Sequence, residues 1–263
     1  MHRSLSDIEG IVCDLDGVVY RGESALPGAI EAIAYMQAQG IKVLFCTNNS
    51  RATIAQYADK LARLGIDVPA ELILTSAVVL GEVLRDRSPR PESAFVIGGD
   101  GVREAVERAG LTLSNDDYDD DVNVVAVGWD PSFTYDHLKR AAFALHRGAA
   151  LIATNDDATF PAEEGRLLPG AGAIVAAVEV GGGVKAEVLG KPHRPMMDAA
   201  AARLAPATRI AVIGDRAETD LAGGYAMGWR TILVLSGVTS AQQAQTLQQQ
   251  PDAVVETLAK LAP

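Results

Sequence analysis

The chain has 263 residues, which suffices for one large α/β domain or for two domains. Apolar residues make up 48% of the chain and charged residues 22%, so it can bury a sizeable core and does not have the composition of a disordered protein. The net charge of −11 argues against nonspecific binding to nucleic acid or to an anionic membrane, because both need a basic surface. It does not exclude an anionic substrate, because a small pocket can hold its own cation.

Two features of the sequence bear on the compartment. Cys13 and Cys46 both lie in strand-like runs outside any zinc-binding spacing, so we expect buried free thiols, as in a reducing compartment. The first ten residues contain no apolar signal segment, and no apolar run is long enough to span a bilayer. The sequence therefore predicts a cytoplasmic protein with no membrane and no nucleic-acid partner.

The first third of the chain alternates between strand-like and helix-like segments. Strands are predicted at 8–15, 41–46 and 71–75, and helices at 29–39, 53–64 and 77–85. Such alternation is typical of βαβ units and a parallel sheet. The charged stretch 87–93, which contains two prolines, then interrupts the pattern and is a candidate boundary.

The rest of the chain continues the same alternation. Strands are predicted at 95–97, 123–127, 151–153, 188–189, 209–213 and 231–235, and helices at 102–108, 135–146, 173–180, 195–204, 220–227 and within the polar tail 241–250. The three glycines at 181–183 are interpreted as a linker. We therefore expect an α/β protein with a Rossmann-like parallel sheet core formed by residues 1–78 and 187–263. Residues 79–186 are expected to form an inserted α/β domain.

Polar side chains follow four of the predicted strands. In chain order these are Asp14 and Asp16, the stretch TNNS at 47–50, Lys191, and then Asp215 with Asp220. Because open parallel sheets bind ligands beyond the carboxyl ends of their strands, we expect these side chains to share one edge. Residues two apart on a strand point to the same side, so Asp14 and Asp16 can flank one reaction centre, and Gly17 allows a sharp turn after them.

The chemistry of this set suits phosphoryl transfer. Several carboxylates around one point repel one another unless a cation or protons compensate, and hard oxygen ligands select Mg²⁺. One carboxylate can attack phosphorus, and a second can protonate the leaving oxygen and then activate water. Thr47 and nearby backbone N–H groups can hold phosphoryl oxygens, and Lys191 can neutralise charge on the transferring group and on the nucleophile.

Four stretches carry a family resemblance. DLDGVVY (14–20), TNNSR (47–51), GKP (190–192) and GDRAETD (214–220) resemble, in this order, the four motifs of the haloacid-dehalogenase (HAD) superfamily of phosphohydrolases. The stretch 153–174 and the long insertion between the second and third motifs resemble the large cap (class IIA, C2 type) of the NagD and p-nitrophenyl phosphatase-like subfamily. The resemblance covers nearly the whole chain, and it identifies the inserted domain as a cap.

The resemblance implies catalytic and metal-binding roles. Asp14 is expected to be the nucleophile, Asp16 the general acid and base, and Lys191 the group that neutralises charge. Mg²⁺ is expected to bind the carboxylates of Asp14 and Asp215 and the backbone carbonyl of Asp16. Asp220 is expected to orient the metal waters or Lys191 from outside the ligand shell. Because Asp16 is an acid, the resemblance favours a phosphatase over a dehalogenase, whose relatives lack this second acid.

The resemblance also implies residues that bind the substrate. Thr47 and Asn48 are expected to hold the phosphoryl group, and Asn49, Ser50 and Arg51 to border the substrate. In the cap, Asn155, Asp156 and Asp157 follow a predicted strand near the active site, and we take Asn155 and Asp157 as substrate-binding residues. Plain turn chemistry is the alternative for this stretch. His193 follows the motif lysine and is a further candidate for substrate contact.

Three other patterns have a competing interpretation. The sequence DLDG also suggests a calcium loop, but Val18 and Val19 occupy positions that need an oxygen ligand and a glycine. Gly190 and Lys191 lack both the earlier glycine and the following Ser or Thr of a P-loop. The acidic stretch 115–121 could bind a cation, and a solvated loop is the favoured interpretation.

These observations together predict a Mg²⁺-dependent phosphatase for small phosphate monoesters that works through an aspartyl-phosphate at Asp14. The resemblance implies p-nitrophenyl phosphate as a model substrate and favours phosphoglycolate or glycerol phosphate. Pyridoxal phosphate and nucleotide monophosphates are alternative substrates. A phosphomutase and a phospho-acceptor module without turnover are alternative functions. The resemblance also implies a homodimer formed through the cap.

Overall fold

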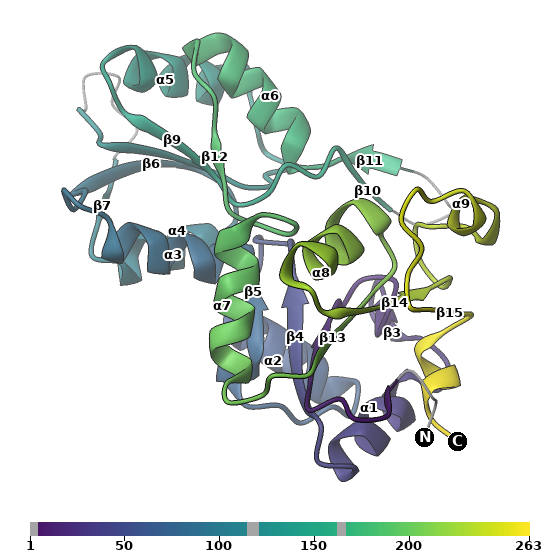
Figure 1. Ribbon diagram of the computed structural model, residues 1–263. Helices are drawn as coiled ribbons and strands as arrows, with labels where there is room; N and C mark the ends of the chain where they lie inside the picture. The colour runs from purple at the N-terminus through teal and green to yellow at the C-terminus, as the bar shows by residue number, and fades with distance from the viewer. Residues whose placement is uncertain (1–4, 115–120, 162–166) are drawn as a thin grey trace. The chain divides into compact units, whose positions relative to one another are not determined.

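The computed structural model describes residues 5–114, 121–161 and 167–263. The chain forms two compact units, each with a sheet of its own: unit 1 contains residues 1–47, 55–74 and 191–263, and unit 2 contains residues 48–54 and 75–190 (Figure 1). The expected domains, 1–78 with 187–263 and 79–186, stay a prediction. The boundaries between the two compact units lie at 74/75 and 190/191, and residues 48–54 also belong to unit 2.

Unit 1 is built on a six-stranded sheet in the order β15-β14-β13-β1-β4-β5. The strands are β1 (Gly10–Cys13), β4 (Lys42–Thr47), β5 (Ile73–Thr75), β13 (Ile210–Gly214), β14 (Arg230–Val234) and β15 (Ala253–Val255). β1 pairs in parallel with both β4 and β13, with Ile11 opposite Val43 and Ala211. The chain runs from β1 to one side and later returns on the other, so β1 lies at the switch point where such sheets bind ligands.

Helices and one small hairpin complete unit 1. They are α1 (Ala29–Ala38), α2 (Ile54–Arg63), α7 (Arg194–Leu204), α8 (Ala222–Met227), α9 (Ala241–Gln245), and the hairpin of β2 (Tyr20–Arg21) with β3 (Ser24–Ala25). Gly40 follows α1 with φ +79°, a left-handed conformation that suits glycine. The predicted helices at 29–39, 53–64 and 195–204 are confirmed within one or two residues.

Unit 2 contains a five-stranded sheet in the order β12-β9-β8-β6-β7, and every neighbouring pair is parallel. The strands are β6 (Ser93–Ile97), β7 (Thr112–Leu113), β8 (Val124–Val127), β9 (Ala150–Ala153) and β12 (Glu187–Val188). The helices α3 (Ser76–Asp86) and α4 (Asp100–Arg108) cover one face, and α5 (Tyr135–His146) and α6 (Ala171–Gly182) cover the other (Figure 1). The predicted α/β fold with parallel sheets is confirmed.

A short antiparallel pair lies outside this sheet in unit 2. It consists of β10 (Thr159–Pro161) and β11 (Leu167–Pro169), with Thr159 opposite Pro169.

The predicted helix at 135–146 matches α5 at both ends. Its first turn is held by a capping box between Thr134 and His137.

The interpretation of the three glycines at 181–183 as a linker is wrong. Gly181 and Gly182 belong to α6, and Gly183 ends that helix with φ +67°. A methyl group at Gly182 would overlap the side chain of Leu145 on α5, and one at Gly181 would lie 3.1 Å from Leu138 Cδ1. The glycines are needed because α6 packs closely on α5, and this packing outweighs the low helix propensity of glycine.

Three further assignments differ from the sequence prediction. The strand predicted at 188–189 was expected to resume the core, but Glu187 and Val188 pair with Ile152 and Ala153 of β9, so β12 belongs to the sheet of unit 2. The stretch 87–93, a candidate boundary, also lies inside unit 2. The helix predicted at 220–227 begins as a π turn at Ala217–Leu221 and continues as α8.

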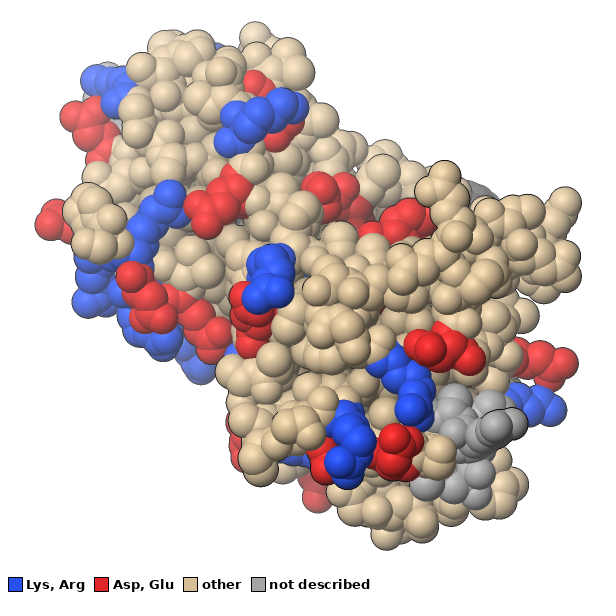
Figure 2. Space-filling model, viewed as in Figure 1, with Lys and Arg blue, Asp and Glu red and all other residues tan. Residues whose placement is uncertain are grey.

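The two cysteines are buried, and charged side chains of both signs lie on the surface. Cys13 and Cys46 are buried and free, as predicted. Lys and Arg side chains are interspersed with Asp and Glu side chains on the face seen in Figure 2. In the part of the chain that the structure describes, every helix is too short or too polar to cross a membrane.

Candidate active site

The switch point of the unit 1 sheet brings the predicted catalytic side chains together. Asp14 follows β1, Thr47 ends β4, and Asp215 follows β13, so three neighbouring parallel strands deliver them to one edge. The Lys191 ammonium donates to Asp14 Oδ1 at 2.5 Å and to Asp220 Oδ1 at 2.7 Å. It also donates to the Cys46 carbonyl oxygen at 2.9 Å, which uses the third of its N–H bonds.

Asp220 is held by the π turn that follows β13. Its backbone N–H donates to the Arg216 carbonyl oxygen at 3.0 Å, and its Oδ2 accepts from the Arg216 backbone N–H at 3.2 Å. These two bonds leave Oδ1 to accept from Lys191. The side chain is 1% exposed, so it acts inside the cluster and fixes the position of the Lys191 ammonium.

Three glycines make room for the carboxylates. Gly17 has φ +81°, and a methyl group there would lie 2.6 Å from Asp215 Oδ2. A methyl group at Gly237 would overlap the Asp215 carboxylate, and one at Gly214 would overlap the Asp220 side chain. Gly237 was not among the predicted site residues, although it stands soon after the predicted strand 231–235.

The Asp215 carboxylate is also held by the backbone. Its Oδ2 accepts from the Val238 N–H at 2.7 Å, and its own carbonyl oxygen accepts from the Thr239 N–H at 3.0 Å. The segment 237–239 therefore fixes Asp215 through two backbone hydrogen bonds. Sequence reasoning missed this segment, because the contact joins positions more than twenty residues apart.

The cluster carries more negative than positive charge. Carboxylate oxygens of Asp14, Asp215 and Asp220 lie within 4.8 Å of one another, and Lys191 supplies one positive charge among them. Burial raises the pKa of Asp14 well above its ordinary value, with Lys191 opposing and the neighbouring acids adding to the rise. Burial, and next the Asp220 carboxylate, raise the pKa of Asp215 to about 6. Burial lowers the pKa of Lys191, but Asp14 and Asp220 outweigh it and hold that pKa well above its ordinary value.

These residues fit a hard divalent cation. Three buried carboxylates around one lysine are short of positive charge, and oxygen donors close together are the ligands that Mg²⁺ prefers. The absence of side chains at Gly17 and Gly237 lets the backbone pack against the Asp215 carboxylate and fix its position. Assigning Asp14, Asp215 and the Asp16 carbonyl as the ligands, with Asp220 outside the shell, stays a prediction.

Asp16 lies in a different environment from Asp14. It is partly buried and forms an isolated bridge with Tyr20, at the start of the β2–β3 hairpin. Burial raises the pKa of Asp16 above its ordinary value, while the charges of Lys60 and Lys191 lower it. A carboxyl group with a raised pKa can carry a proton to a leaving oxygen, as a general acid must.

The phosphoryl-binding candidate Thr47 is also placed at this edge. Its side chain is buried and shares a hydrogen bond with Tyr57 of α2. Tyr57 is itself buried, and the nearby Asp16 contributes to raising its pKa. Neither Tyr57 nor Lys60 was among the predicted site residues, because nothing in their local sequence distinguishes them from other residues of an amphipathic helix.

The remaining predicted residues from motif two lie in unit 2, where Asn48 is the centre of a polar cluster. Asn48 Nδ2 donates to Asp157 Oδ1 at 3.2 Å and Oδ2 at 3.3 Å. Its carbonyl oxygen accepts from Asn155 Nδ2 at 2.8 Å and from Ser76 Oγ at 2.6 Å. The Asp157 N–H donates to Asn155 Oδ1 at 3.2 Å, so turn chemistry and the polar cluster coexist here. The structure thus joins Asn48 to Asn155 and Asp157, which lie more than 100 residues later in the chain.

Asn49, Ser50 and Arg51 continue the same loop in different settings. Asn49 is exposed, and its Oδ1 accepts from the Arg51 backbone N–H at 3.1 Å. Ser50 is fully buried, with its Oγ 2.9 Å from Thr154 Oγ1, so its hydroxyl ties the loop to the strand end of β9. The Arg51 guanidinium lies 5.3 Å from the centroid of Trp129. Their expected contacts with substrate stay a prediction.

Two other predicted positions complete the set. His193 is the residue before the first turn of α7 in unit 1, with an extended backbone, and it is partly buried. Its contact with substrate stays a prediction. The acidic stretch at 115–121 lies outside the described residues except for Asp121. Asp121 Oδ1 lies 3.4 Å from Arg147 Nε, in a contact between exposed side chains.

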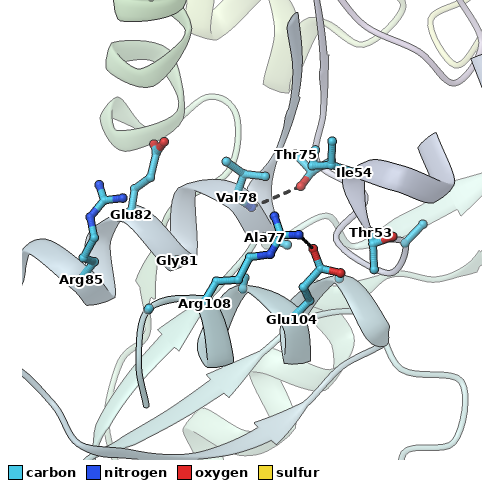
Figure 3. A pocket seen from close by; sticks show the side chains of 14 residues that line it. Thr53, Ile54, Thr75, Ala77, Val78, Gly81, Glu82, Arg85, Glu104 and Arg108 are labelled. Atoms are coloured by element: carbon cyan, nitrogen blue, oxygen red, sulfur yellow. Dashed lines mark hydrogen bonds and ion pairs between the residues drawn. The ribbon is translucent and has the colours of Figure 1, made fainter. Parts of the chain in front are cut away.

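Unit 2 also contains a cavity of about 180 Å³ between α3, α4 and residues 52–54 (Figure 3). None of the predicted site residues lines it. Its apolar wall includes Ile54, Ala77 and Val78, and at its rim Arg108 pairs with Glu104 at 2.9 Å. The Thr75 hydroxyl beside it accepts from the Val78 N–H and caps α3. These contacts tie the walls of the cavity to one another.

Buried carboxylates around one lysine, at the switch point of a parallel sheet, are suited to an α/β enzyme that transfers phosphoryl groups. Two family models agree with this class: haloacid dehalogenase-like hydrolase matches residues 11–112, and a HAD-hydrolase-like model matches residues 188–261. The chain belongs to the haloacid dehalogenase-like hydrolases. It is an enzyme of the phosphoric monoester hydrolase class, and the predicted resemblance to the NagD and p-nitrophenyl phosphatase-like subfamily is confirmed.

Similar proteins include enzymes named for several phosphate esters. An acid sugar phosphatase of Staphylococcus aureus is 36% identical over 242 residues, which are 92% of each chain. The structure of a 4-nitrophenylphosphatase from Thermotoga maritima has a TM-score of 0.89 and 32% identity, over 99% of this chain and 98% of that one. A glycerol phosphate phosphatase from Mycobacterium tuberculosis, in complex with magnesium, has a TM-score of 0.87 and 30% identity, over 99% of this chain and 78% of that one.

Proposed function

We propose that the chain is a Mg²⁺-dependent phosphatase of small phosphate monoesters that works through an aspartyl-phosphate at Asp14. The observation that carries this proposal is the position of Lys191, whose ammonium binds Asp14 and Asp220 among buried carboxylates. This arrangement holds Asp14 rigidly and supplies positive charge where a phosphoryl group would arrive. The magnesium complex of the M. tuberculosis relative supports the choice of metal.

The metal has a defined set of candidate ligands in this chain. Asp14, Asp215 and the backbone carbonyl of Asp16 would hold it, and Asp220 would keep Lys191 in place beside it. When bound, Mg²⁺ would neutralise the excess carboxylate charge and the charge on the phosphoryl oxygens. Burial raises the pKa of Asp14 and of Asp215, which is consistent with a site that favours an added positive charge.

The first chemical step uses Asp14 and Asp16. One carboxylate oxygen of Asp14 attacks phosphorus while the bond from phosphorus to the leaving oxygen breaks, and Lys191 holds the Oδ1 atom of Asp14. Asp16 donates its proton to the leaving oxygen, which departs as an alcohol. The Thr47 hydroxyl and adjacent backbone N–H groups hold the phosphoryl oxygens. Tyr57 shares a hydrogen bond with the Thr47 side chain.

The second step releases phosphate. Asp16, now a carboxylate, takes a proton from a water molecule, and the water oxygen attacks the phosphorus of phospho-Asp14. The bond between phosphorus and the Asp14 oxygen breaks, which frees inorganic phosphate and restores both carboxyl groups. Lys191 again stabilises the charge on the Asp14 carboxylate as it leaves.

For the substrate, we propose a small phosphate ester with a hydroxylated or carboxylated leaving group, of the glycerol phosphate, phosphoglycolate or sugar phosphate type. The names of the relatives from S. aureus and M. tuberculosis support this class. The cluster of Asn48, Asn155 and Asp157 offers amide and carboxylate groups suited to hydroxyls. Pyridoxal phosphate and nucleotide monophosphates are the alternatives to test.

The decisive experiment measures phosphate release from a panel of these monoesters, with and without Mg²⁺, for the wild type and Asp14→Asn. We expect Mg²⁺-dependent release, and a loss of at least about 10³-fold in kcat in the variant, because the nucleophile is gone while the fold remains. Full activity of a correctly folded Asp14→Asn would reject the nucleophile. Transfer between sugars without free phosphate would identify a mutase. A stable phospho-Asp14 without release would identify an acceptor module.

We also propose a homodimer formed through unit 2 and a reducing, cytoplasmic location. Tyr135, Phe143 and Val180 on α5 and α6 are large apolar side chains exposed by 78%, 53% and 85%, which is the kind of surface that subunits cover. Val180→Glu should shift sedimentation from dimer to monomer at micromolar concentration without changing activity. A monomeric wild type at the same concentration would reject the dimer. The two buried thiols support the location, because neither is paired.

A further inference from the structure

Helix α2 (Ile54–Arg63) carries two side chains that contact residues next to the candidate active site of unit 1. Tyr57 and Lys60 are three positions apart and therefore lie on the same face of the helix. Tyr57 is 4% exposed, and the side chain of Lys60 is 19% exposed although lysine is normally a surface residue. A lysine ammonium that is largely shielded from water needs partners for its charge.

Lys60 finds its partners on the β2–β3 hairpin. Its Nζ lies 3.8 Å from the centroid of the Tyr20 ring, a cation–π contact, and 3.5 Å from Glu23 Oε1. Tyr20 is 1% exposed, so its ring is fixed by its surroundings as well as by the ammonium. One cation on α2 therefore contacts both the first strand of the hairpin and its turn.

The same hairpin is bonded to the turn that carries Asp16. The Gly17 N–H donates to the Tyr20 carbonyl oxygen at 2.8 Å, and the Tyr20 N–H donates to the Leu15 carbonyl oxygen at 3.2 Å. Asp16 itself forms a bridge with Tyr20. Any shift of Tyr20 thus moves the backbone on both sides of Asp16. The Lys60 ammonium contacts the Tyr20 ring and can hold it in place.

Tyr57 supports a second residue of the site. It shares a hydrogen bond with Thr47, the last residue of β4. Thr47 is the residue that we expect to hold phosphoryl oxygens, so its rotamer matters for binding the transferring group. The two residues of α2 thus act on two different catalytic groups.

We propose that Lys60 and Tyr57 are positioning residues of the reaction: Lys60 fixes the turn that carries Asp16, and Tyr57 fixes the hydroxyl of Thr47. The inference rests on the proposed function, in which Asp16 protonates the leaving oxygen and Thr47 holds the phosphoryl group. Neither residue touches the reacting atoms. Their two effects differ, because only Asp16 acts on the leaving group.

The difference gives a test that a loss of fold would not imitate. Nitrophenolate leaves with little need for a proton, whereas the alkoxide of glycerol phosphate needs one. Lys60→Met keeps an unbranched side chain of similar length and removes the charge. We expect it to lower kcat on glycerol phosphate by about 10- to 100-fold and on p-nitrophenyl phosphate by about threefold or less. Tyr57→Phe removes only the hydroxyl, and we expect both substrates to lose kcat equally.

Two control variants separate positioning from general destabilisation. Arg63→Met removes the other cation of α2 that faces Glu23, at 3.9 Å, from a side chain that is 65% exposed, and kcat on both substrates should stay within twofold. Lys60→Arg keeps a cation that can lie over Tyr20, and it should restore most of the activity on glycerol phosphate. Melting temperatures confirm that each variant is folded at the assay temperature.

Asp16→Ala, measured on the same two substrates, separates the inference from the function on which it rests. If Asp16→Ala lowers kcat on both substrates equally, the acid role of Asp16 fails and the proposed function must change. If Asp16→Ala shows the leaving-group effect but Lys60→Met lowers both substrates equally or neither, the positioning role of Lys60 is rejected. If Tyr57→Phe leaves kcat unchanged on both substrates, or lowers it on one alone, the role of Tyr57 is rejected.

Discussion

Two polar clusters of this protein differ in how their side chains are held. In unit 1, Asp14, Asp220 and Lys191 are at least nine-tenths buried and are held by ionic hydrogen bonds. In unit 2, Asn48, Asn155 and Asp157 are held by amide hydrogen bonds to one another and carry one charge. The first cluster stores unfavourable charge that a ligand can relieve, and the second does not.

This contrast suggests a division of labour. Buried charges interact strongly with a phosphoryl group and a cation, so the cluster in unit 1 suits chemistry that is the same for every substrate. Neutral amides and one carboxylate recognise hydroxyls through geometry, at a modest energy for each bond, so the cluster in unit 2 suits the choice among substrates. The predictions that follow test each half of this contrast, beginning with the strongest effect.

The largest effect is expected from Lys191→Met. This change leaves the buried carboxylates of Asp14 and Asp220 without their cation and removes the donor to the Cys46 carbonyl oxygen. Removing one partner of a buried ion pair costs about 3–5 kcal/mol, so the metal-free variant should melt about 10 °C lower, and activity should vanish. Calorimetry without Mg²⁺ measures the first effect.

Two further variants sharpen this prediction. Asp220→Asn in the Lys191→Met background removes one of the unpaired charges, so it should regain part of the lost melting temperature without regaining activity. Lys185→Met is the matched surface control: Lys185 also forms an ion pair, at 2.7 Å with Glu179, but its side chain is 88% exposed. Its loss should cost at most about 1 kcal/mol. Equal destabilisation by the two lysine variants would contradict the contrast between the clusters.

A smaller effect is expected from removing the metal at different pH values. Burial and Asp220 raise the pKa of Asp215 to about 6 in the folded, metal-free chain, above its value in the unfolded chain. The folded state then binds a proton that the unfolded state does not, so metal-free stability is highest below the unfolded pKa and falls as pH rises through about 6. The melting temperature in EDTA should therefore decrease between pH 5 and pH 7.

Magnesium should change this pH dependence. A bound cation compensates the ionised carboxylates, and it stabilises the fold by mass action, about 2.7 kcal/mol at a concentration of 100 Kd. The rise in melting temperature on adding Mg²⁺ should thus be larger at pH 7 than at pH 5. Asp215→Asn should flatten the pH dependence in EDTA and remove most of the response to Mg²⁺. A response to Mg²⁺ that is independent of pH would argue against Asp215 as a ligand.

The sequence was sufficient to predict where residues lie when their own strand sets the position. Asp14, Thr47 and Asp215 stand at the ends of three apolar runs, and a parallel sheet brings such ends to one edge whatever the loops do. Lys191 was predicted from its motif, although the short strand before it belongs to the other sheet. The alternation of elements likewise predicted the helices and the longer strands.

The residues that the sequence did not reveal act through contacts between distant segments. Gly237 is needed because the Asp215 carboxylate lies against it, and Lys60 matters because Tyr20 lies beneath its ammonium. Gly181 and Gly182 suggested a linker, since glycine is flexible in isolation, yet they are helical because Leu138 and Leu145 pack on them. Local propensity carries no information about such packing partners.

The smallest and most selective effect is expected in unit 2. Asp157→Asn keeps the size of the side chain and removes the charge that accepts from Asn48 Nδ2 at 3.2 and 3.3 Å. If this cluster chooses among substrates, kcat/KM should change by about three- to tenfold for esters with hydroxylated leaving groups, mainly through KM. The change should be less than about twofold for p-nitrophenyl phosphate, whose leaving group offers no hydroxyl donor.

Asp156→Asn makes the same change of charge one residue away, on an exposed side chain, and is the matched control for Asp157→Asn. It should leave the rank order of substrates as in the wild type, because an exposed carboxylate is screened by water and salt. If both variants shift the rank order alike, the net charge of the segment matters and not the pair of Asn48 with Asp157. If Asp157→Asn instead lowers kcat equally on every ester, the cluster of unit 2 serves the chemistry that all substrates share, and the division between the two clusters does not hold.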